Sequence, residues 1–148
     1  MRYFTALFEP KHAEIWNNED VKIACFPQSK ESEANNKEIG PGDRFVCYMT
    51  EKSRIIGILE AESKPFISND KLSNDEKTEY PLRFKVKPIV WNKVGISIKD
   101  EIIWNNLNAT KNKTKLTEIN KIRSNLPQWE LKDGQFLESL LLTIKTFS

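Results

Sequence analysis

The chain has 148 residues, and its 23 lysines and arginines against 21 aspartates and glutamates give a formal net charge of +2. This length predicts one domain over residues 1–148, with an ordinary hydrophobic core that needs no disulfide or metal. No apolar run approaches the roughly 18 residues of a membrane span, and residues 1–8 lack the features of a signal peptide. We therefore expect a cytoplasmic protein with no membrane partner.

Two cysteines and one histidine leave few groups for nucleophilic or metal chemistry. Cys25 and Cys47 each lie in an apolar run, which is typical of buried thiols, and a cysteine–histidine pair could use only His12. The 5 glycines form no phosphate-binding loop, and no GxSxG or HExxH motif is present. The composition therefore favours a binding module over an enzyme and implies no cofactor and no metal.

Residues 1–39 alternate short apolar runs with polar segments, which predicts strands joined by short helices. Pro10 suits the first turn of a helix, because it lacks only an N–H that would be unpaired there. Ser29 or Ser32 would cap the second helix. The expected elements are a strand over residues 2–8, a helix over 12–16, a strand over 21–26 and a helix over 29–39.

A tight turn at residues 40–43, Gly-Pro-Gly-Asp, opens a predicted β-hairpin. Glycine permits a positive φ, and proline presets φ at the second position of the turn. Two apolar runs follow, over residues 44–50 and 54–62, with the polar residues 51–53 between them. Gly57 in the second run indicates a bulge or the close approach of another segment.

Residues 68–77 are polar and have no period, which predicts a long exposed loop. The next strand, over residues 80–91, has a period of two, so one face should be buried and the other cationic. The apolar residues of this pattern are Leu82, Phe84 and Val86, and the cations between them are Arg83, Lys85 and Lys87. Pro88 should end the regular pairing, with one more short strand over residues 94–98.

The last third of the chain is predicted to be helical. A short helix covers residues 102–107, and a C-terminal helix covers 133–144. Between them an apolar stripe predicts an amphipathic helix. The stripe consists of Leu116, Ile119, Ile122 and Leu126. Five or six strands with helices at the ends predict an α+β fold built on a small mixed sheet or barrel.

The charges are unevenly distributed along the chain. Residues 111–123 hold five cations and one acid, and residues 83–93 hold four cations and no acid, whereas acids gather at 31–38 and 70–79. This pattern predicts a basic face, for which an ordinary solvated surface is the alternative interpretation.

Several segments share their order and spacing with a known family. The strongest are residues 40–48 (Gly-Pro-Gly-Asp-Arg-Phe-Val-Cys-Tyr), residues 55–66 with Ile-Ile-Gly-Ile-Leu-Glu and Ser-Lys-Pro-Phe, and residues 80–88 (Tyr-Pro-Leu-Arg-Phe-Lys-Val-Lys-Pro). Tyr-Phe at residues 3–4 and Phe-Glu-Pro at 8–10 also fit. Together they resemble the EVE domain family, a PUA-like family related to YTH domains, and its archaeal-type stand-alone or restriction-linked members.

The resemblance implies a PUA-like mixed β-pseudobarrel with a pocket for a modified base, and nucleic acid as the partner. The base would be a methylated cytosine or adenine, with DNA slightly ahead of RNA because some relatives are fused to restriction machinery. A fused or partner restriction subunit is therefore also implied. A base taken out of its stack must regain stacking energy, about 1–3 kcal/mol per aromatic contact, and the flanking phosphates need cations.

One position departs from the family's pattern. The second apolar segment of the family usually contains a cage tryptophan, whereas Ala24 stands at that place here. Phe26 faces the same side of an extended segment and is the first candidate replacement, and Trp16 is the second. Tyr80 matches the aromatic that YTH domains place in the loop before the strand corresponding to residues 82–87.

The expected pocket therefore combines aromatic walls with polar atoms for the base edge. Its candidate residues are Phe26, Tyr80, Trp16, Cys25, Tyr48, Trp104, Phe8 and Glu9. The candidate phosphate-binding residues are Arg83, Lys111, Lys113 and Lys115. A position in the core is the competing interpretation for each aromatic, and Glu9 is equally suited to stabilise the N-terminus of a helix beginning at Pro10.

The function that these residues predict is recognition of a modified base without catalysis. Ala24 motivates an alternative, which is a small-molecule sensor or a protein-interaction module with a degenerate pocket. A third interpretation is an enzyme resembling ASCH-type amidohydrolases, which would need Glu9 paired with a lysine in the pocket.

Overall fold

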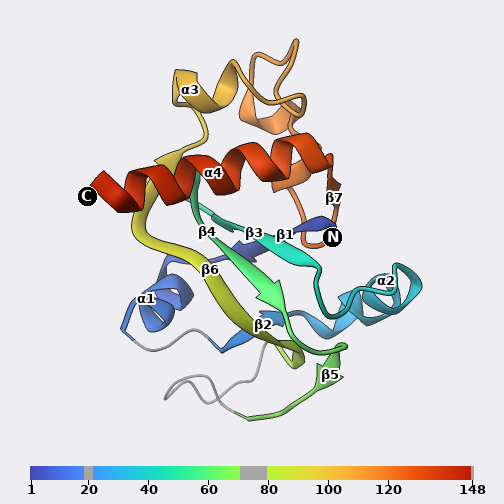
Figure 1. Cartoon of the computed structure of the whole chain (residues 1–148). Coiled ribbons are helices and arrows are strands. Elements are labelled where there is room, and N and C mark those ends of the chain that lie inside the picture. Colours follow the sequence, from blue (N-terminus) through green and yellow to red (C-terminus); the bar gives the residue numbers. More distant parts are fainter. Residues whose placement is uncertain (19–21, 71–79, 148) are drawn as a thin grey trace.

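The computed structural model describes residues 1–18, 22–70 and 80–147, and its strands form one sheet flanked by helices (Figure 1). The strands are β1 (Tyr3–Phe8), β2 (Ile23–Phe26), β3 (Arg44–Met49), β4 (Arg54–Ala61), β5 (Phe66–Ile67), β6 (Leu82–Ser97) and β7 (Gln128–Trp129). The helices are α1 (Pro10–Asn18), α2 (Glu31–Asn36), α3 (Glu101–Trp104) and α4 (Leu131–Phe147), with 3₁₀ turns η1 (Gln28–Lys30), η2 (Leu116–Glu118) and η3 (Asn120–Ile122).

The sheet has the strand order β2-β6-β4-β3-β1-β7, with β5 beside β6, and it does not close into a barrel. β1 and β3 run parallel, whereas β3, β4 and β6 are antiparallel neighbours. A parallel pair needs a crossover connection, and residues 9–43 supply it with α1, β2 and α2. The fold is thus of the predicted α+β class, a mixed sheet with flanking helices, and the described residues hold seven strands rather than five or six.

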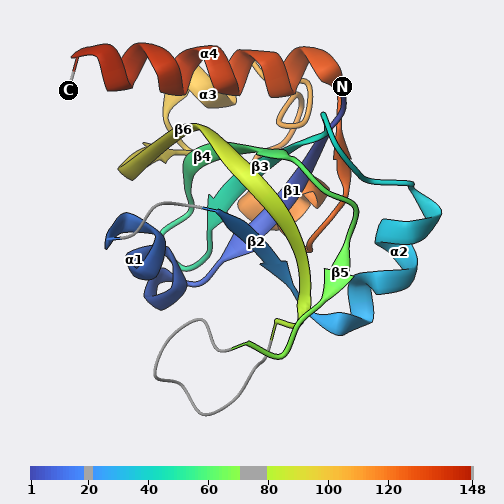
Figure 2. The same cartoon turned by 60° about the horizontal axis from the view of Figure 1, so that its bottom comes forward.

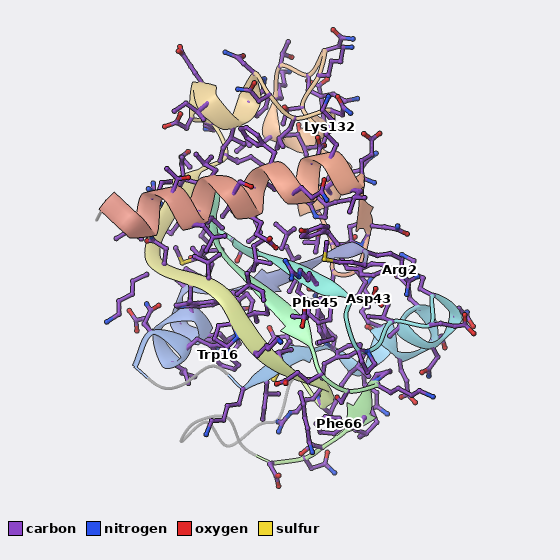
Figure 3. All side chains as sticks on the ribbon, in the orientation of Figure 1. Arg2, Trp16, Asp43, Phe45, Phe66 and Lys132 are labelled. Atoms are coloured by element: carbon purple, nitrogen blue, oxygen red, sulfur yellow. The ribbon has the colours of Figure 1, made fainter. Side chains whose placement is uncertain are left out.

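The crossover ends in the predicted tight turn. The amide of Asp43 donates to the carbonyl of Gly40 at 3.0 Å, and Gly42 has a φ of 92°, which only glycine adopts without strain. The Asp43 carboxylate also forms an ion pair with Arg2 at 2.8 Å, and the two side chains lie together beside α2 (Figure 3). This pair ties the N-terminus of the chain to the turn that starts β3.

The helix before this turn differs from its prediction. It begins as η1 and continues as α2, and neither the residue before η1 nor the residue before α2 makes a side-chain capping bond. Ser29 lies inside the 3₁₀ turn and Ser32 inside the first turn of α2, so neither can act as the cap. Glu31 and Glu33 occupy the first turn of α2, where carboxylates complement the helix dipole.

The predicted hairpin of β3 and β4 is present, and its irregularity lies at Gly57. The register shifts between Cys47 and Tyr48 on β3, opposite Gly57 on β4. A Cβ atom at Gly57 would lie 2.7 Å from Cε3 of Trp91 and 2.9 Å from the carbonyl oxygen of Val90. The glycine therefore permits the close approach of β6 that its place in the strand predicts.

β6 is longer than predicted. The two separate strands expected over residues 80–91 and 94–98 are one strand, Leu82–Ser97, and Pro88 does not end the pairing. Pro88 stays opposite Leu59 on β4, and the proline is absorbed by a shift of register beside it. The exposed loop predicted over residues 68–77 lies mostly outside the described residues, because residues 71–79 are not described.

The C-terminal third contains one long helix and two short turns. The predicted amphipathic helix over residues 116–126 is wrong: its apolar stripe lies on η2, η3 and the segment that follows. Leu116, Ile119 and Ile122 are spaced by three, which matches the three residues per turn of a 3₁₀ helix better than an α-helix. None of the helices in the described ranges is long and apolar enough to cross a membrane.

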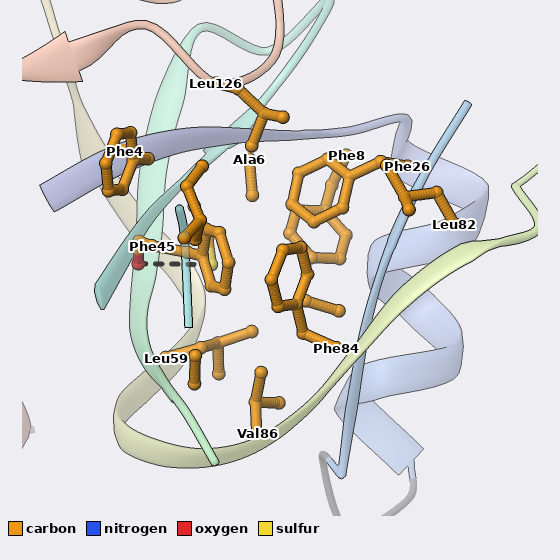
Figure 4. Packing of buried hydrophobic residues seen from close by; sticks show 14 of the residues in the cluster. Phe4, Ala6, Phe8, Phe26, Phe45, Leu59, Leu82, Phe84, Val86 and Leu126 are labelled. Atoms are coloured by element: carbon orange, nitrogen blue, oxygen red, sulfur yellow. Dashed lines mark hydrogen bonds between the residues drawn. The ribbon is translucent and has the colours of Figure 1, made fainter. Parts of the chain in front are cut away.

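The two faces of the sheet carry separate clusters of buried residues. α4 lies across one face, where Tyr3, Tyr48 and Trp129 are buried with residues of α3 and η3 (Figure 2). The other face holds an aromatic cluster in which Phe26, Phe45 and Phe84 meet with ring centroids 5.1–5.8 Å apart (Figure 4). This second cluster extends to Phe8 and Trp16, so the packing of α1 and the end of β1 depends on it.

Candidate functional site

A small pocket lies where the end of β1, α1, β2 and the segment just before β6 meet. Its lining residues are Leu7, Phe8, His12, Trp16, Cys25 and Tyr80. We call this set the aromatic pocket. Four of the eight predicted base-pocket residues, Phe8, Trp16, Cys25 and Tyr80, are therefore brought together, from parts of the chain more than 70 positions apart.

The walls of the aromatic pocket are fixed by ring contacts and by hydrogen bonds. Phe8 meets Trp16 edge to face at 5.7 Å between ring centroids and meets Trp91 in the same way at 5.6 Å. The indole N–H of Trp16 donates to the carbonyl of Ile23 at 3.0 Å, and that of Trp91 donates to Oδ1 of Asn17 at 2.9 Å. These bonds hold α1 against β2 and β6, so the ring positions are set before any ligand arrives.

Tyr80 lines the aromatic pocket and contacts Glu9 and His12 beside it. Its hydroxyl lies 3.4 Å from Oε1 of Glu9, and the ring of His12 meets the Tyr80 ring at a right angle with centroids 4.9 Å apart. The space that remains is about 10 Å³, which is roughly what one water molecule needs. A planar base can enter only if a lining side chain moves, and Tyr80 lies outside the core cluster that holds Trp16 and Phe8.

The surroundings of the two thiols do not activate them as nucleophiles. Burial raises the pKa of Cys25 to about 12, and the charge of Arg83 on the neighbouring strand lowers it only in part. Burial also raises the pKa of Cys47 far above its usual range. Both stay protonated at neutral pH, so Cys25 offers the pocket a weak polar contact and no covalent chemistry.

Glu9 has a lysine partner, but the pair is open to water. Nζ of Lys11 lies 3.7 Å from the Glu9 carboxylate, and the two side chains are 60% and 46% exposed. An acid–base pair gains strength from exclusion of water, so this geometry does not favour the amidohydrolase interpretation. Within the described ranges, no three histidine, cysteine or acidic side chains are placed to hold a metal ion.

Phe26 does not line the aromatic pocket, contrary to the prediction that it replaces the missing tryptophan. Its side chain is fully buried and packs against Phe45 and Phe84 (Figure 4). Phe26 and Ala24 do share one face of β2, but that face points into the core. Cys25, between them, is the residue that faces the pocket.

Tyr48 and Trp104 also lie elsewhere. Tyr48 is buried in the cluster beneath α4. Trp104 is the last residue of α3, is half-buried against the same cluster, and lines a different groove. Both belong to the opposite face of the sheet from Phe8 and Trp16, so neither can contact a base held between those two rings.

Arg83 is a structural residue, contrary to its prediction as a phosphate contact. Only 2% of it is exposed, and its guanidinium donates to the carbonyl of Tyr80 at 3.3 Å, to Oγ of Ser68 at 3.2 Å and to the carbonyl of Asp70. Arg83 thus fastens the backbone of Tyr80 to the segment after β5. The alternation of β6 does place it on the outer face, but these residues cover it.

The three predicted phosphate-binding lysines are exposed but distant from the aromatic pocket. Lys111, Lys113 and Lys115 lie in the segment after α3, on the other side of α4 from α1 and β2 (Figure 1). Two cations that lie nearer in the fold are Lys22, just before β2, and Lys85, opposite Ile23 on β6. Both are exposed, and neither forms an ion pair with another described residue.

Two pocket residues were absent from the predicted set. His12 precedes Trp16 by four residues, and this spacing places both on one face of a helix, so the signal for His12 was present in the sequence. Leu7 carried no such signal. Its neighbour Phe8 lies on the opposite side of β1, and the two line the same pocket because it forms at the strand's end.

Solved structures with this fold include YTH domains, whereas no family model matches the chain. A YTH domain of Mmi1 in complex with RNA has a TM-score of 0.66 and 11% identity, over 99% of this chain and 85% of that one. The YTH domain of Zygosaccharomyces rouxii MRB1 in complex with N6-methyladenosine RNA has a TM-score of 0.64 and 15% identity, over 95% and 83%. Protein Atu2648 from Agrobacterium tumefaciens has a TM-score of 0.60 and 13% identity, over 95% and 92%.

Identities this low establish a shared fold, and one relative at higher identity establishes the family. A UPF0310 protein of Pyrococcus abyssi (strain GE5 / Orsay) is 32% identical over 117 residues, which are 71% of this chain and 78% of that protein. The aligned part covers most of both sequences. The chain therefore belongs to the UPF0310 family.

Proposed function

We propose that this protein is a non-catalytic nucleic-acid-binding module that holds a modified base in the aromatic pocket. One observation carries the proposal: Phe8, Trp16 and Tyr80 converge on one pocket at the end of β1, in a fold shared with YTH domains. Two of those YTH structures are complexes with RNA or with N6-methyladenosine RNA. N6-methyladenine is therefore the first candidate, ahead of methylated cytosine.

The pocket offers each part of such a base a fitting partner. The rings of Trp16 and Phe8 form an apolar wall that a methyl group and a base plane can contact, with about 1–3 kcal/mol per stacked base. The Glu9 carboxylate, now beside the Tyr80 hydroxyl, can accept a hydrogen bond from the exocyclic N–H that a methylated amine retains. In this arrangement Tyr80 turns outward on binding and then stacks on the other face of the base.

The same proposal assigns the flanking phosphates to Lys22 and Lys85. The amide of Val86 donates to the carbonyl of Lys22 at 2.9 Å, so the two strands that carry these lysines are fastened together beside Cys25. Lys87, further along β6, is partly neutralised by Glu60 at 3.2 Å. Cation–phosphate contacts release counterions, so binding should weaken steeply as salt is added.

RNA is the first substrate to test, because the YTH structures are RNA complexes, and DNA, which the sequence alone favours, is the second. The proposal needs no fused or partner restriction subunit. We would measure fluorescence anisotropy with short oligonucleotides that carry N6-methyladenine, 5-methylcytosine or no modification, as RNA and as DNA, at two salt concentrations. Tighter binding of one modified strand over its unmodified control is the expected result.

Tyr80→Ala should reduce the preference for the modified strand, by roughly tenfold if one stacking contact is lost. Phe136→Ala is the matched control, since Phe136 is also a half-buried aromatic residue but lies on α4, outside the aromatic pocket. It should leave the ratio of modified to unmodified affinity unchanged. Equal affinity for modified and unmodified strands in the unaltered protein would refute the proposal.

Ala24, at the place of the family's usual cage tryptophan, favours one second candidate, a small-molecule sensor. Its ligand would displace a lining side chain and enter the aromatic pocket without any nucleic-acid strand. This candidate predicts that free nucleosides or other planar compounds quench tryptophan fluorescence, whereas no oligonucleotide binds.

A further inference from the structure

A second, larger cavity is lined by α3 and the segment that follows it. Figure 1 shows these elements on the side of α4 away from α1 and β2. The cavity consists of two adjoining hollows of about 590 and 430 Å³ that share Trp104 and Asn105. We call them together the α3 groove. The first hollow is lined by Lys99, Glu101, Trp104, Asn105, Thr114, Lys115, Leu116 and Thr117, and the second by Trp104 to Asn108 and Thr110 to Lys113.

Trp104 differs from the other three tryptophans in its hydrogen bonding. The indole N–H groups of Trp16, Trp91 and Trp129 donate to Ile23, Asn17 and Thr5, respectively, at 2.8–3.0 Å. Among the described residues, the indole of Trp104 has no such acceptor, and its half-buried ring faces both hollows. Trp104 therefore presents a ring and a free donor to whatever enters the α3 groove.

The segment that forms the groove is held in shape. The Asp133 carboxylate accepts the amides of Asn108 and Ala109, each at 2.9 Å, and the Thr110 hydroxyl donates to the carbonyl of Trp104 at 2.6 Å. Glu118 accepts the amide of Lys115 at 3.0 Å. A loop pinned at both ends loses little conformational entropy when a ligand binds.

The side chains that line the groove carry four positive charges and one negative charge, that of Glu101. The lysines are all exposed, and none forms an ion pair with another residue in the described part of the chain; they are Lys99, Lys111, Lys113 and Lys115. The other acids of this region accept hydrogen bonds from the groove's own segment; they are Asp100, Glu118, Glu130 and Asp133. Glu118 is already engaged, since hydrogen bonds from Thr114 and Lys115 lower its pKa, with the charge of Lys113 adding to the effect. Four cations around one open aromatic ring fit an anionic ligand with planar groups.

We infer that the α3 groove binds single-stranded nucleic acid whether or not its bases are modified. One base stacks on Trp104, and the phosphates on either side lie against Lys99, Lys111, Lys113 and Lys115. Aromatic rings with cations beside them are the usual means of holding single strands without reading their sequence. The inference does not rest on the aromatic pocket, because no residue is common to the two sites.

The test uses unmodified oligouridine and oligothymidine, so that RNA and DNA form separate arms. Lys111→Ala/Lys113→Ala should weaken binding roughly tenfold and lower the slope of log K against log salt by about 1.4, since each phosphate contact on a single strand contributes about 0.7. Lys52→Ala/Lys64→Ala removes the same charge from two exposed lysines elsewhere and should change both quantities far less. Equal losses in the two double variants would overturn the inference.

A second readout separates a nucleic-acid site from a merely basic surface. Trp104→Phe keeps the core contact, and oligonucleotide binding should quench less of the tryptophan fluorescence in this variant than in the unaltered protein. A polyglutamate peptide of the same charge should compete poorly. Equal competition by the peptide, or unchanged quenching in Trp104→Phe, would show that no base stacks in the groove. If no base stacks in the α3 groove, the preference of the aromatic pocket for a modified strand is unaffected. The two proposals can therefore fail separately.

Discussion

The aromatic pocket and the α3 groove differ in what they offer a nucleic acid: the first offers aromatic rings, and the second offers open space and positive charge. The aromatic pocket has several rings and little free space, about 10 Å³, and its one indole donor, that of Trp16, is already bonded. The α3 groove has one tryptophan, two hollows of about 590 and 430 Å³, and four exposed lysines. The aromatic pocket is therefore suited to stacking on a base, and the α3 groove is suited to contacts with phosphates.

This difference follows from where the two sites lie in the fold. The aromatic pocket lies at the edge of the phenylalanine cluster, so Phe8 and Trp16 contribute to stability, whereas Tyr80, outside the regular strands, does not belong to that cluster. The α3 groove is made by a connecting segment on the surface, where charged side chains cost little. A strong preference for one base needs the first kind of site, and general affinity needs the second.

The largest expected effect is the loss of stability when the Phe26 side chain is removed. This substitution tests whether Phe26 belongs to the core or to the aromatic pocket. Phe26→Ala should lower the free energy of unfolding by about 3–5 kcal/mol, because it leaves a cavity among Phe45 and Phe84. Urea denaturation measures the change, with Phe66→Ala on the partly exposed β5 as the control of small effect. If Phe26→Ala were as stable as the control but lost its preference for a modified base, Phe26 would be a pocket residue after all.

Phe26 and Arg83 show what a sequence pattern can and cannot tell. Alternation in β2 correctly places Phe26 and Ala24 on one face, but it does not say whether that face meets the core or the pocket. Alternation in β6 places Arg83 outward, and its burial comes from Ser68 and Asp70, which precede it by 13 to 15 positions. Which segment covers a strand is decided by tertiary packing, which a local period does not contain.

Elements whose patterns are strong were predicted well. The turn at residues 40–43, the hairpin after it and the C-terminal helix all appear, because glycine, proline and apolar spacing specify them locally. The stripe over residues 116–126 was misread as an α-helix because a spacing of three also fits 3₁₀ turns. The distance of the three lysines from the pocket could not be predicted, since it depends on how α4 crosses the sheet.

The second largest effect concerns the support of the α3 groove. Asp133→Ala removes the acceptor of two partly buried backbone amides and should cost about 2–3 kcal/mol of stability. It should also weaken binding of unmodified strands while leaving the ratio of modified to unmodified affinity unchanged. Asp133→Asn keeps one acceptor oxygen. Its stability and its affinity for unmodified strands should therefore lie between those of Asp133→Ala and those of the unaltered protein. A change in the ratio would mean that the two sites are coupled.

A smaller effect is expected at the back wall of the aromatic pocket. Gly57→Ala would place a Cβ 2.7 Å from Cε3 of Trp91, so the ring must shift, at a cost of about 1–3 kcal/mol. Because Trp91 supports Phe8, the preference for a modified base should fall, whereas binding at the α3 groove should not. Gly40→Ala is the control, since its nearest contact would be a lysine side-chain atom at 3.8 Å. Thermal melting measures the loss of stability, and fluorescence anisotropy measures the ratio of modified to unmodified affinity.

The smallest effect is the reactivity of Cys25, which reports whether the pocket is closed. A pKa of about 12 leaves so little thiolate at pH 8 that alkylation by iodoacetamide should be about a thousandfold slower than for a free cysteine. Its pKa is higher in the folded than in the unfolded chain, so its contribution to stability is present below about pH 8.5 and is lost as pH rises toward 12.

Mass spectrometry of the peptide that contains Cys25 follows its alkylation, and Cys47, which is fully buried, is the internal control. Tyr80→Ala should speed the reaction at Cys25 but not at Cys47, because Tyr80 shares the aromatic pocket with Cys25 and not with Cys47. A modified oligonucleotide should slow the reaction at Cys25 in this variant, whereas an unmodified strand in the α3 groove should leave the rate unchanged. Rapid alkylation of Cys25 at pH 8 in the unaltered protein would mean that the pocket stands open to water, and the contrast between a closed stacking site and an open charged groove would fail.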